Sequence, residues 1–116
     1  MAKPVIMTVD DDPEVLGAIG RDLRGHYGAD YRILSAGSPH DALAAVVQLK
    51  KRATPIALFL VDQRMPEMTG TALLGEMRKL YPDACKVLLT AYADTEAAIA
   101  AINEVEIGRA SCRERV

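Results

Sequence analysis

The sequence predicts one α/β domain built on a doubly wound parallel sheet. Three apolar runs, at 4–9, 56–61 and 85–90, lack the clean alternation of half-exposed strands and are typical of strands covered on both faces. Stretches with apolar residues at helical spacing lie between these runs, and the connections are short. With 116 residues, 50% of them hydrophobic, the chain can bury the core of a single soluble domain.

The first helix and the strand that follows it carry clear boundary signals. Asp12 is expected as the N-cap and Pro13 as the first helical residue, and the helix is expected to end near residue 28. Residues 31–35 alternate in the manner of a less buried strand, which favours a place at the edge of the sheet. The core-facing residues expected from this helix are Leu16, Ile19 and Leu23.

Three further helices are expected. Ser38 and Pro39 begin the second, Pro82 lies just beyond the end of the third, and Asp94 caps the fourth. Their expected core-facing residues are Leu43, Val46 and Val47 in the second, Leu73, Leu74, Met77 and Leu80 in the third, and Ala97, Ala98, Ala101, Ile102 and Val105 in the fourth. Strand and helix therefore alternate four times, as a doubly wound sheet requires.

Composition and charge exclude several classes of function. The formal net charge is −2, and the run at 50–52 is the one cluster of basic residues, so the chain carries no electrostatic footprint for direct contact with nucleic acid. The first residues hold too short an apolar run for a signal peptide, and no later run has the length of a membrane span. We expect a cytoplasmic protein without a membrane partner.

Acidic and polar residues gather at the expected carboxyl ends of the strands, where open α/β sheets bind ligands. These residues are Asp10, Asp11 and Asp12 after the first strand, Asp62 after the third, and Thr90 after the fourth. Carboxylates brought together would raise one another's pKa unless a cation lay among them. The set offers oxygen ligands without His or Cys nearby, which favours Mg²⁺ or Mn²⁺ over zinc. Thr90 could donate a hydrogen bond to a phosphoryl oxygen, whereas Asp12 is better explained as a helix cap.

Three segments together resemble the receiver domain of two-component response regulators. They are "VDDDP" (9–13), "LFLVDQRMPEMTG" (58–70) and "VLLTAYAD" (87–94), and the resemblance covers roughly residues 3–105. It implies the flavodoxin-like receiver fold, with strands in the order 2-1-3-4. It also implies a signalling domain that accepts a phosphoryl group and loses it by its own hydrolysis, rather than a turnover enzyme.

The resemblance assigns a role to each matching residue. Asp62 matches the phosphoacceptor, which becomes an aspartyl phosphate, and Asp10 and Asp11 match the acidic pair that binds the metal, with Asp11 the more direct ligand. Arg64 matches the residue whose backbone carbonyl completes the metal site. Thr90 matches the hydroxyl residue that follows the phosphoryl group and signals its arrival.

Further positions and the partners follow from the same resemblance. Ala91 matches the small residue that leaves the phosphoryl group access, while Pro66 and Gly70 match the loop that shapes the site, where Gly permits a tight entry into the third helix. Arg64 and Tyr92 are expected to flank the phosphoryl group. The implied donor is the phosphohistidine of a histidine kinase or phosphotransfer protein, and the implied target is an output domain fused to the receiver.

The end of the sequence departs from the receiver pattern. A receiver continues into a fifth strand that ends in a Lys-Pro step and then into a fifth helix, but "EIGRASCRERV" (106–116) contains no Lys and neither periodicity. Written back into codons, this segment matches a widely used sequencing-library adapter. We therefore expect residues 1–105 to be an incomplete receiver domain and residues 106–116 to be a non-native or disordered tail. Without the fifth strand, the fourth would be an exposed edge that favours self-association.

Two alternatives remain open at this point. A receiver-like docking module would use the same fold without taking up phosphate. A phosphatase of the haloacid-dehalogenase type would use the Asp-x-Asp spacing after the first strand, with Asp10 as nucleophile and Asp12 as acid. The second alternative leaves the motif around Asp62 unexplained.

Overall fold

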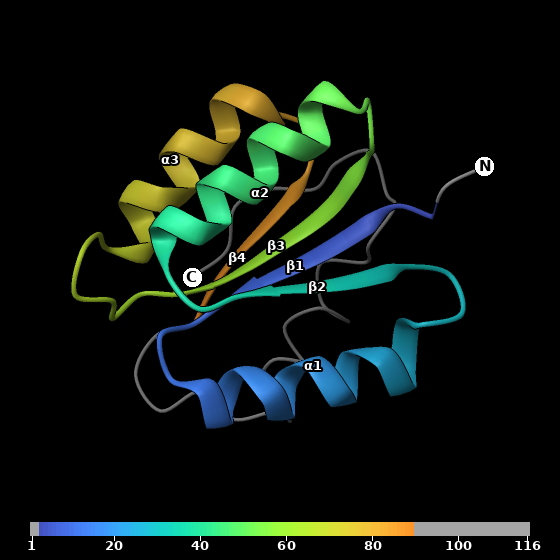
Figure 1. The fold of residues 1–116 in the computed structure, drawn as a ribbon, viewed down its shortest axis with the longest axis horizontal. Helices are drawn as coiled ribbons and strands as arrows, with labels where there is room; N and C mark the ends of the chain where they lie inside the picture. The colour runs from blue at the N-terminus through green and yellow to red at the C-terminus, as the bar shows by residue number, and fades with distance from the viewer. Residues whose placement is uncertain (1–2, 90–116) are drawn as a thin grey trace.

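The computed structural model describes residues 3–89, which form a four-stranded sheet and three helices (Figure 1). The strands are β1 (Val5–Val9), β2 (Arg32–Ala36), β3 (Ile56–Asp62) and β4 (Cys85–Leu89), and the helices are α1 (Pro13–Tyr27), α2 (Pro39–Lys51) and α3 (Gly70–Leu80). All neighbouring strands are parallel, in the order β2-β1-β3-β4. The predicted doubly wound sheet and its strand order are confirmed. The expected fourth helix at 94–105, Thr90, Ala91, Tyr92 and the expected tail lie outside the described residues.

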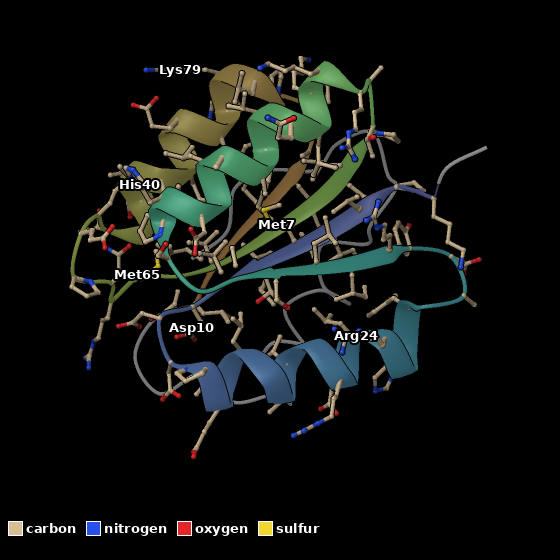
Figure 2. The ribbon with its side chains drawn as sticks, in the orientation of Figure 1. Met7, Asp10, Arg24, His40, Met65 and Lys79 are labelled. Carbon is tan, nitrogen blue, oxygen red and sulfur yellow. The ribbon has the colours of Figure 1, made fainter. Side chains whose placement is uncertain are left out.

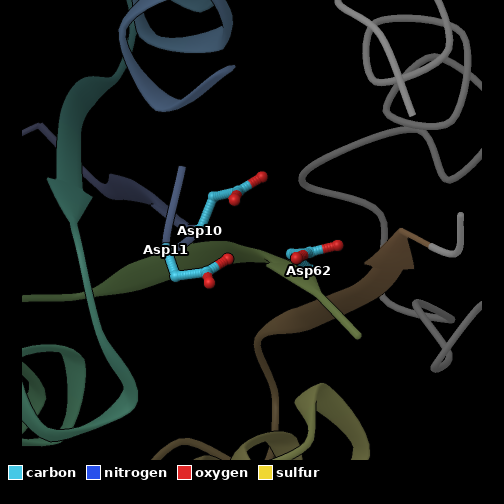
Figure 3. Close-up of side chains that lie close together, drawn as sticks. All are labelled: Asp10, Asp11 and Asp62. Atoms are coloured by element: carbon cyan, nitrogen blue, oxygen red, sulfur yellow. The ribbon is translucent and has the colours of Figure 1, made fainter. Parts of the chain in front are cut away.

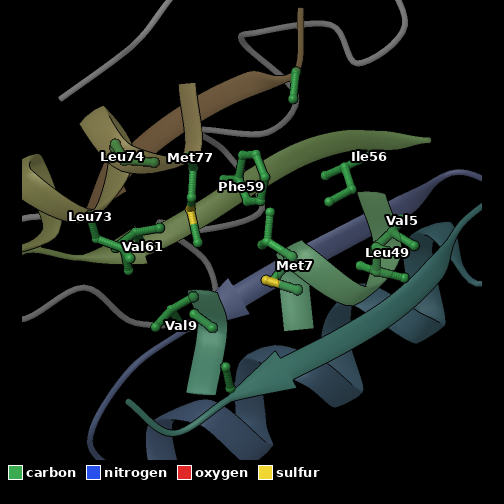
Figure 4. Close-up of a cluster of buried hydrophobic side chains, with 14 of the residues drawn as sticks. Val5, Met7, Val9, Leu49, Ile56, Phe59, Val61, Leu73, Leu74 and Met77 are labelled. Carbon is green, nitrogen blue, oxygen red and sulfur yellow. The ribbon is translucent and has the colours of Figure 1, made fainter. Parts of the chain in front are cut away.

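The helices cover the two faces of the sheet unequally. Helices α2 and α3 lie side by side on one face, and α1 lies on the other (Figure 1). Met7, Phe59 and Met77 belong to the core beneath α2 and α3 (Figure 4), whereas Ile6, Ile19 and Leu58 belong to the core beneath α1. Successive residues of β1 thus enter opposite cores, and all five are buried. This double burial explains why the strand lacks an alternating pattern.

A side-chain oxygen caps the N-terminus of each of the three helices. Asp12 Oδ1 accepts hydrogen bonds from the backbone N–H of Glu14 (3.0 Å) and of Val15 (3.4 Å), and Ser38 Oγ accepts one from Asp41 (3.1 Å). The expected caps of the first two helices are therefore confirmed. Both are followed by Pro in the first turn, where its missing N–H leaves no unsatisfied donor.

On α1 and α3, burial confirms these expected core residues: Ile19, Leu23, Leu73, Leu74 and Met77. Val46 is fully buried, but Val47 is 38% exposed, so the prediction that Val47 faces the core is wrong. Consecutive residues of a helix point about 100° apart, and the buried stripe of α2 runs through Ala42, Val46 and Leu49. Val47 lies beside that stripe. Leu16, Leu43 and Leu80 are half-buried.

Strand β2 is the less buried edge strand that the sequence predicts, with its first residue exposed and its last buried. A search of residues 3–89 finds no helix with both the length and the apolar character needed to cross a bilayer.

Candidate functional site

Three carboxylates meet where β1 and β3 end (Figure 3). Asp62 is the last residue of β3, and Asp10 and Asp11 directly follow β1. The two strands are parallel neighbours with Val9 opposite Val61, so Asp10 and Asp62 leave the sheet at the same level. One carboxylate oxygen from each of Asp10, Asp11 and Asp62 lies within 4.8 Å of the other two. The structure thus brings together the three acidic residues that were expected to share a site.

Asp10 is the most buried of the three, with 7% of its surface exposed. Its backbone N–H donates to Ala36 O on β2 (3.2 Å), and its Oδ1 accepts from the backbone N–H of Asp12 (2.9 Å). Burial raises the pKa of the Asp10 carboxyl to about 6, and the charges of Asp62, Asp11 and Asp12 add to that increase. The hydrogen bond from Asp12 opposes the rise without cancelling it.

Asp62 is half-buried and its pKa is also raised, first by burial and then by the charge of Asp11. Backbone N–H groups of Arg64 and Gln63 and the charge of Arg64 act in the opposite direction. Two neighbouring carboxyl groups are therefore both harder to ionise than a free aspartate. Burial, with a smaller contribution from the neighbouring carboxylates, outweighs the cationic and N–H groups that favour the ionised forms.

Comparison with known families identifies the family to which the chain belongs. The family model of the response regulator receiver domain matches residues 6–107. The chain belongs to the response regulator receiver domain family. The haloacid-dehalogenase alternative is thereby set aside, and Asp12, its expected acid, serves as the cap of α1.

Individual relatives agree with the family. The hydrogenase transcriptional regulatory protein HoxA of Cupriavidus necator is 31% identical over 102 residues, which are 88% of this chain and 19% of HoxA. The transcriptional regulatory protein ZraR of Salmonella typhimurium is 38% identical over 97 residues, which are 84% of this chain and 20% of ZraR. The chain thus spans a fifth or less of the length of these two curated relatives.

A solved structure shows the same fold. The CheY-like response regulator receiver domain protein of Methanospirillum hungatei matches with a TM-score of 0.67 at 26% identity, over 99% of this chain and 81% of that chain. The match includes the four-stranded part described above and agrees with the strand order of the receiver fold.

The donor set of the receiver site fits a hard divalent cation. Three carboxylates supply oxygen ligands of the kind that Mg²⁺ and Mn²⁺ prefer. The raised pKa values of Asp10 and Asp62 show that the carboxylates are crowded and partly desolvated. A cation among them would relieve that repulsion. Asp12 is not part of the set, because its side chain caps α1.

The loop between β3 and α3 returns close to the end of β3, at Asp62. A Cβ added to Gly70 would lie 2.5 Å from Asp62 O and 2.6 Å from Leu88 Cδ1, so only glycine fits this entry into α3. Met65 is buried in the core beneath α2 and α3 and anchors the middle of the loop, on the same side of the molecule as Asp10 (Figure 2). Arg64 and Pro66, on either side of Met65, are exposed. The tight entry expected of Gly70 is present.

Sequence reasoning missed the part that Gln63 takes in the site. Gln63 follows Asp62, and its Oε1 accepts hydrogen bonds from the backbone N–H of Thr71 (2.9 Å) and from Thr71 Oγ1 (3.0 Å). The two residues are eight positions apart, outside the spacing of any capping motif that a sequence shows. The one available signal was a polar side chain directly after a buried strand.

Proposed function

We propose that this receiver domain accepts a phosphoryl group on Asp62 in a reaction that depends on Mg²⁺ or Mn²⁺. The supporting observation is the convergence of Asp10, Asp11 and Asp62, whose oxygens lie within 4.8 Å of one another at the carboxyl ends of β1 and β3. Asp62 is half-buried and lies at the end of a mostly buried central strand, while the side chain and the backbone N–H of Asp10 are both hydrogen-bonded. This arrangement suits a carboxylate nucleophile beside a metal site.

The transfer would proceed by direct displacement at phosphorus. A carboxylate oxygen of Asp62 forms the new O–P bond, the P–N bond of a partner's phosphohistidine breaks, and the departing imidazole nitrogen keeps the electron pair and takes up a proton. The donor would be a histidine kinase or a phosphotransfer protein. Catalysis in such a step is mainly positioning and charge stabilisation, since no acid or base on this chain has to take a proton from the nucleophile.

Asp10, Asp11 and Asp62 would hold the cation together with the backbone carbonyl of Arg64. Asp11 is exposed and would be the more direct ligand, whereas Asp10 is buried and oriented by the N–H of Asp12. A bound divalent cation supplies positive charge that offsets the charge of the carboxylates and of the transferring group. Thr90, which follows β4, would donate a hydrogen bond to the phosphoryl group and carry the signal onward.

The signal would pass to an output domain. Relatives such as HoxA and ZraR are transcriptional regulators at least five times as long as the matched segment, and this chain corresponds to their receiver portion. We propose the same division of labour here, with no direct contact between the receiver and nucleic acid. The acyl phosphate would be lost by hydrolysis at the same site, so the domain acts as a cytoplasmic switch rather than as a turnover enzyme.

Incubation with acetyl phosphate tests the proposal. We expect the chain to take up acid-stable, base-labile phosphate in Mg²⁺ and not in excess chelator, and Asp62→Asn to take up none. Asp12→Asn is the matched control, because it neutralises a nearby carboxylate that caps α1 without joining the cluster, and Asn caps helices equally well. Equal uptake by Asp62→Asn would contradict the proposal. No uptake by the unchanged chain would favour a docking module.

A further inference from the structure

Gln63 links three parts of the fold at the phosphoacceptor. Its backbone N–H donates to Leu89 O at the end of β4 (3.0 Å), and its backbone carbonyl accepts from Gly70 N–H at the start of α3 (3.2 Å). Its side-chain Oε1 accepts from both the N–H and the hydroxyl of Thr71. One residue next to Asp62 therefore contacts β4, the first residue of α3 and the second.

The first turn of α3 depends on these contacts. An α-helix begins with backbone N–H groups that have no partner within the helix. In α3, the N–H of Gly70 goes to Gln63 O, that of Thr71 goes to Gln63 Oε1, and that of Ala72 goes to Thr69 Oγ1 (3.2 Å). Gln63 thus accepts hydrogen bonds from two of these three N–H groups. The bond from Thr71 requires a side-chain acceptor at position 63.

The loop that these contacts close is the one that shapes the site. The loop at 64–69 starts directly after Gln63, and the residues that follow it, Gly70 and Thr71, donate hydrogen bonds to Gln63. The two ends of the loop are therefore held together at Gln63. Arg64 is the first residue of that loop. One peptide unit therefore separates the hydrogen-bonded backbone of Gln63 from the backbone of Arg64.

We propose that Gln63 is a positioning residue whose side-chain amide holds α3 against the phosphoacceptor strand and thereby orients the loop backbone for metal binding. This inference rests on one part of the proposed function, the cation site among Asp10, Asp11 and Asp62. A merely structural cap would stabilise α3 and leave metal affinity unchanged. A positioning role makes metal affinity depend on the hydrogen bond from Thr71 to Gln63, although neither side chain is a ligand.

Mn²⁺ titration of the 116-residue chain, followed by electron paramagnetic resonance, separates the two roles. Gln63→Met keeps the length of the side chain but removes its acceptor, so both hydrogen bonds from Thr71 are lost. We expect the Kd for Mn²⁺ to rise about fivefold. Thr71→Val should raise the Kd by a smaller factor, and Thr71→Ser, which restores the hydroxyl, should return it to the original value. Gln48→Met, a matched exchange at an exposed position of α2, should leave it unchanged.

Amide hydrogen exchange gives a readout that does not involve the metal. In Gln63→Met we expect faster exchange at Thr71 than in the unchanged chain, with exchange at Ala72 much less affected because Thr69 still caps it. A variant with faster exchange at Thr71, or a lower unfolding midpoint, but an unchanged Kd for Mn²⁺ would overturn the proposal and leave Gln63 as a cap. Absence of Mn²⁺ binding by the unchanged chain would also overturn it.

The Mn²⁺ titration and the uptake of phosphate together distinguish failure of the proposed function from failure of the positioning role. If the chain binds Mn²⁺ and loses affinity on Gln63→Met but takes no phosphate from acetyl phosphate, the phosphoacceptor role of Asp62 fails and the positioning role stands. If the chain is phosphorylated on Asp62 and Gln63→Met alters neither the Kd nor the rate of uptake, the positioning role fails alone.

Discussion

The ionised form of Asp10 lowers the stability of the fold. Its carboxyl is buried between the ends of β1 and β2, and the nearby carboxylates of Asp62 and Asp11 add to the cost of ionising it. The pKa of Asp10 is therefore about 6 in the folded chain against 3.8 for the ordinary group. A charge kept at such a position destabilises the apo fold near neutral pH, and this favours a function for the charge itself.

The pH dependence of stability follows from this shift. Between pH 3.8 and about 6, folded Asp10 retains a proton that the unfolded chain releases, so without divalent cation the free energy of unfolding should fall as pH rises through that window. At about 1.36 kcal/mol per pKa unit, this shift sets an upper limit of about 3 kcal/mol on the contribution of Asp10. Urea unfolding at a series of pH values in chelator measures it, and Asp10→Asn should flatten the dependence. An unchanged slope in that variant would contradict the assignment.

Single residues also mark where sequence reasoning succeeds and where it stops. Asp12 was predictable as a cap because Asp-Pro before an apolar stripe is a local signal, and Asp10, Asp11 and Asp62 were predictable because parallel strands end at one edge. Lys86 was not predictable. It is 4% exposed, and its Nζ donates to the backbone carbonyls of Tyr81 (3.2 Å) and Ala84 (2.6 Å), a solution that depends on how the α3–β4 loop happens to turn.

At the scale of elements, α3 is the helix most closely fitted to the site. Its first residue packs against the backbone of Asp62, whereas Gly75, in the middle of the helix, would meet nothing within 4 Å if it carried a Cβ. The two glycines of α3 therefore have different roles. Gly70 allows a close approach, and Gly75 only lowers the helical propensity of the segment.

The contrast between these glycines is measurable. Gly70→Ala should destabilise the fold by about 1–3 kcal/mol, because its Cβ would collide with Asp62 O and Leu88 and force the backbone to shift. Gly75→Ala should stabilise it by about 0.5–1 kcal/mol through helix propensity. Denaturant unfolding compares the two, and a Gly70→Ala variant as stable as the parent would show that α3 does not approach the strand so closely.

Helix α2 offers a second test, at the position where the sequence prediction is wrong. Val46→Ala should lose about 1–3 kcal/mol because it empties a fully buried position, whereas Val47→Ala should change stability by less than about 0.5 kcal/mol. In the sequence, the helical pattern does not distinguish the adjacent residues Val46 and Val47 as candidates for the core. The sheet beneath α2 selects one of them, and no local pattern reveals the rotation of the helix. Equal losses at both positions would contradict the observed rotation.

At the scale of the whole molecule, the layers formed by residues 3–89 place Asp10, Asp11 and Asp62 at one edge of the sheet. Helices α2 and α3 cover one face and α1 the other, so both faces of β1 and β3 are buried and the strand ends meet at the site (Figure 1). These layers were predictable from the period of the apolar residues. The Gln63–Thr71 contact was not, because it depends on how the loop folds between two elements that were each predicted correctly.

The order of strands also bears on self-association. Within residues 3–89, β4 is the last strand of the sheet and pairs with β3 alone. A free β4 edge would offer backbone donors and acceptors to a second chain, and we propose on this ground that the 116-residue polypeptide forms concentration-dependent dimers or larger species. Sedimentation velocity over a wide range of concentrations is the measurement. A single monomeric species throughout would contradict the expectation.

The central claim is that Asp62 accepts the phosphoryl group with the help of a cation held among Asp10, Asp11 and Asp62. The most direct measurement is peptide-level mass spectrometry of the chain after incubation with phosphoramidate, with and without Mg²⁺. We predict one added phosphoryl group, located on Asp62, that requires Mg²⁺ and disappears in alkaline buffer. A phosphoryl group found on Asp10 or Asp11 instead, or on Asp62 to the same extent in excess chelator, would contradict the account.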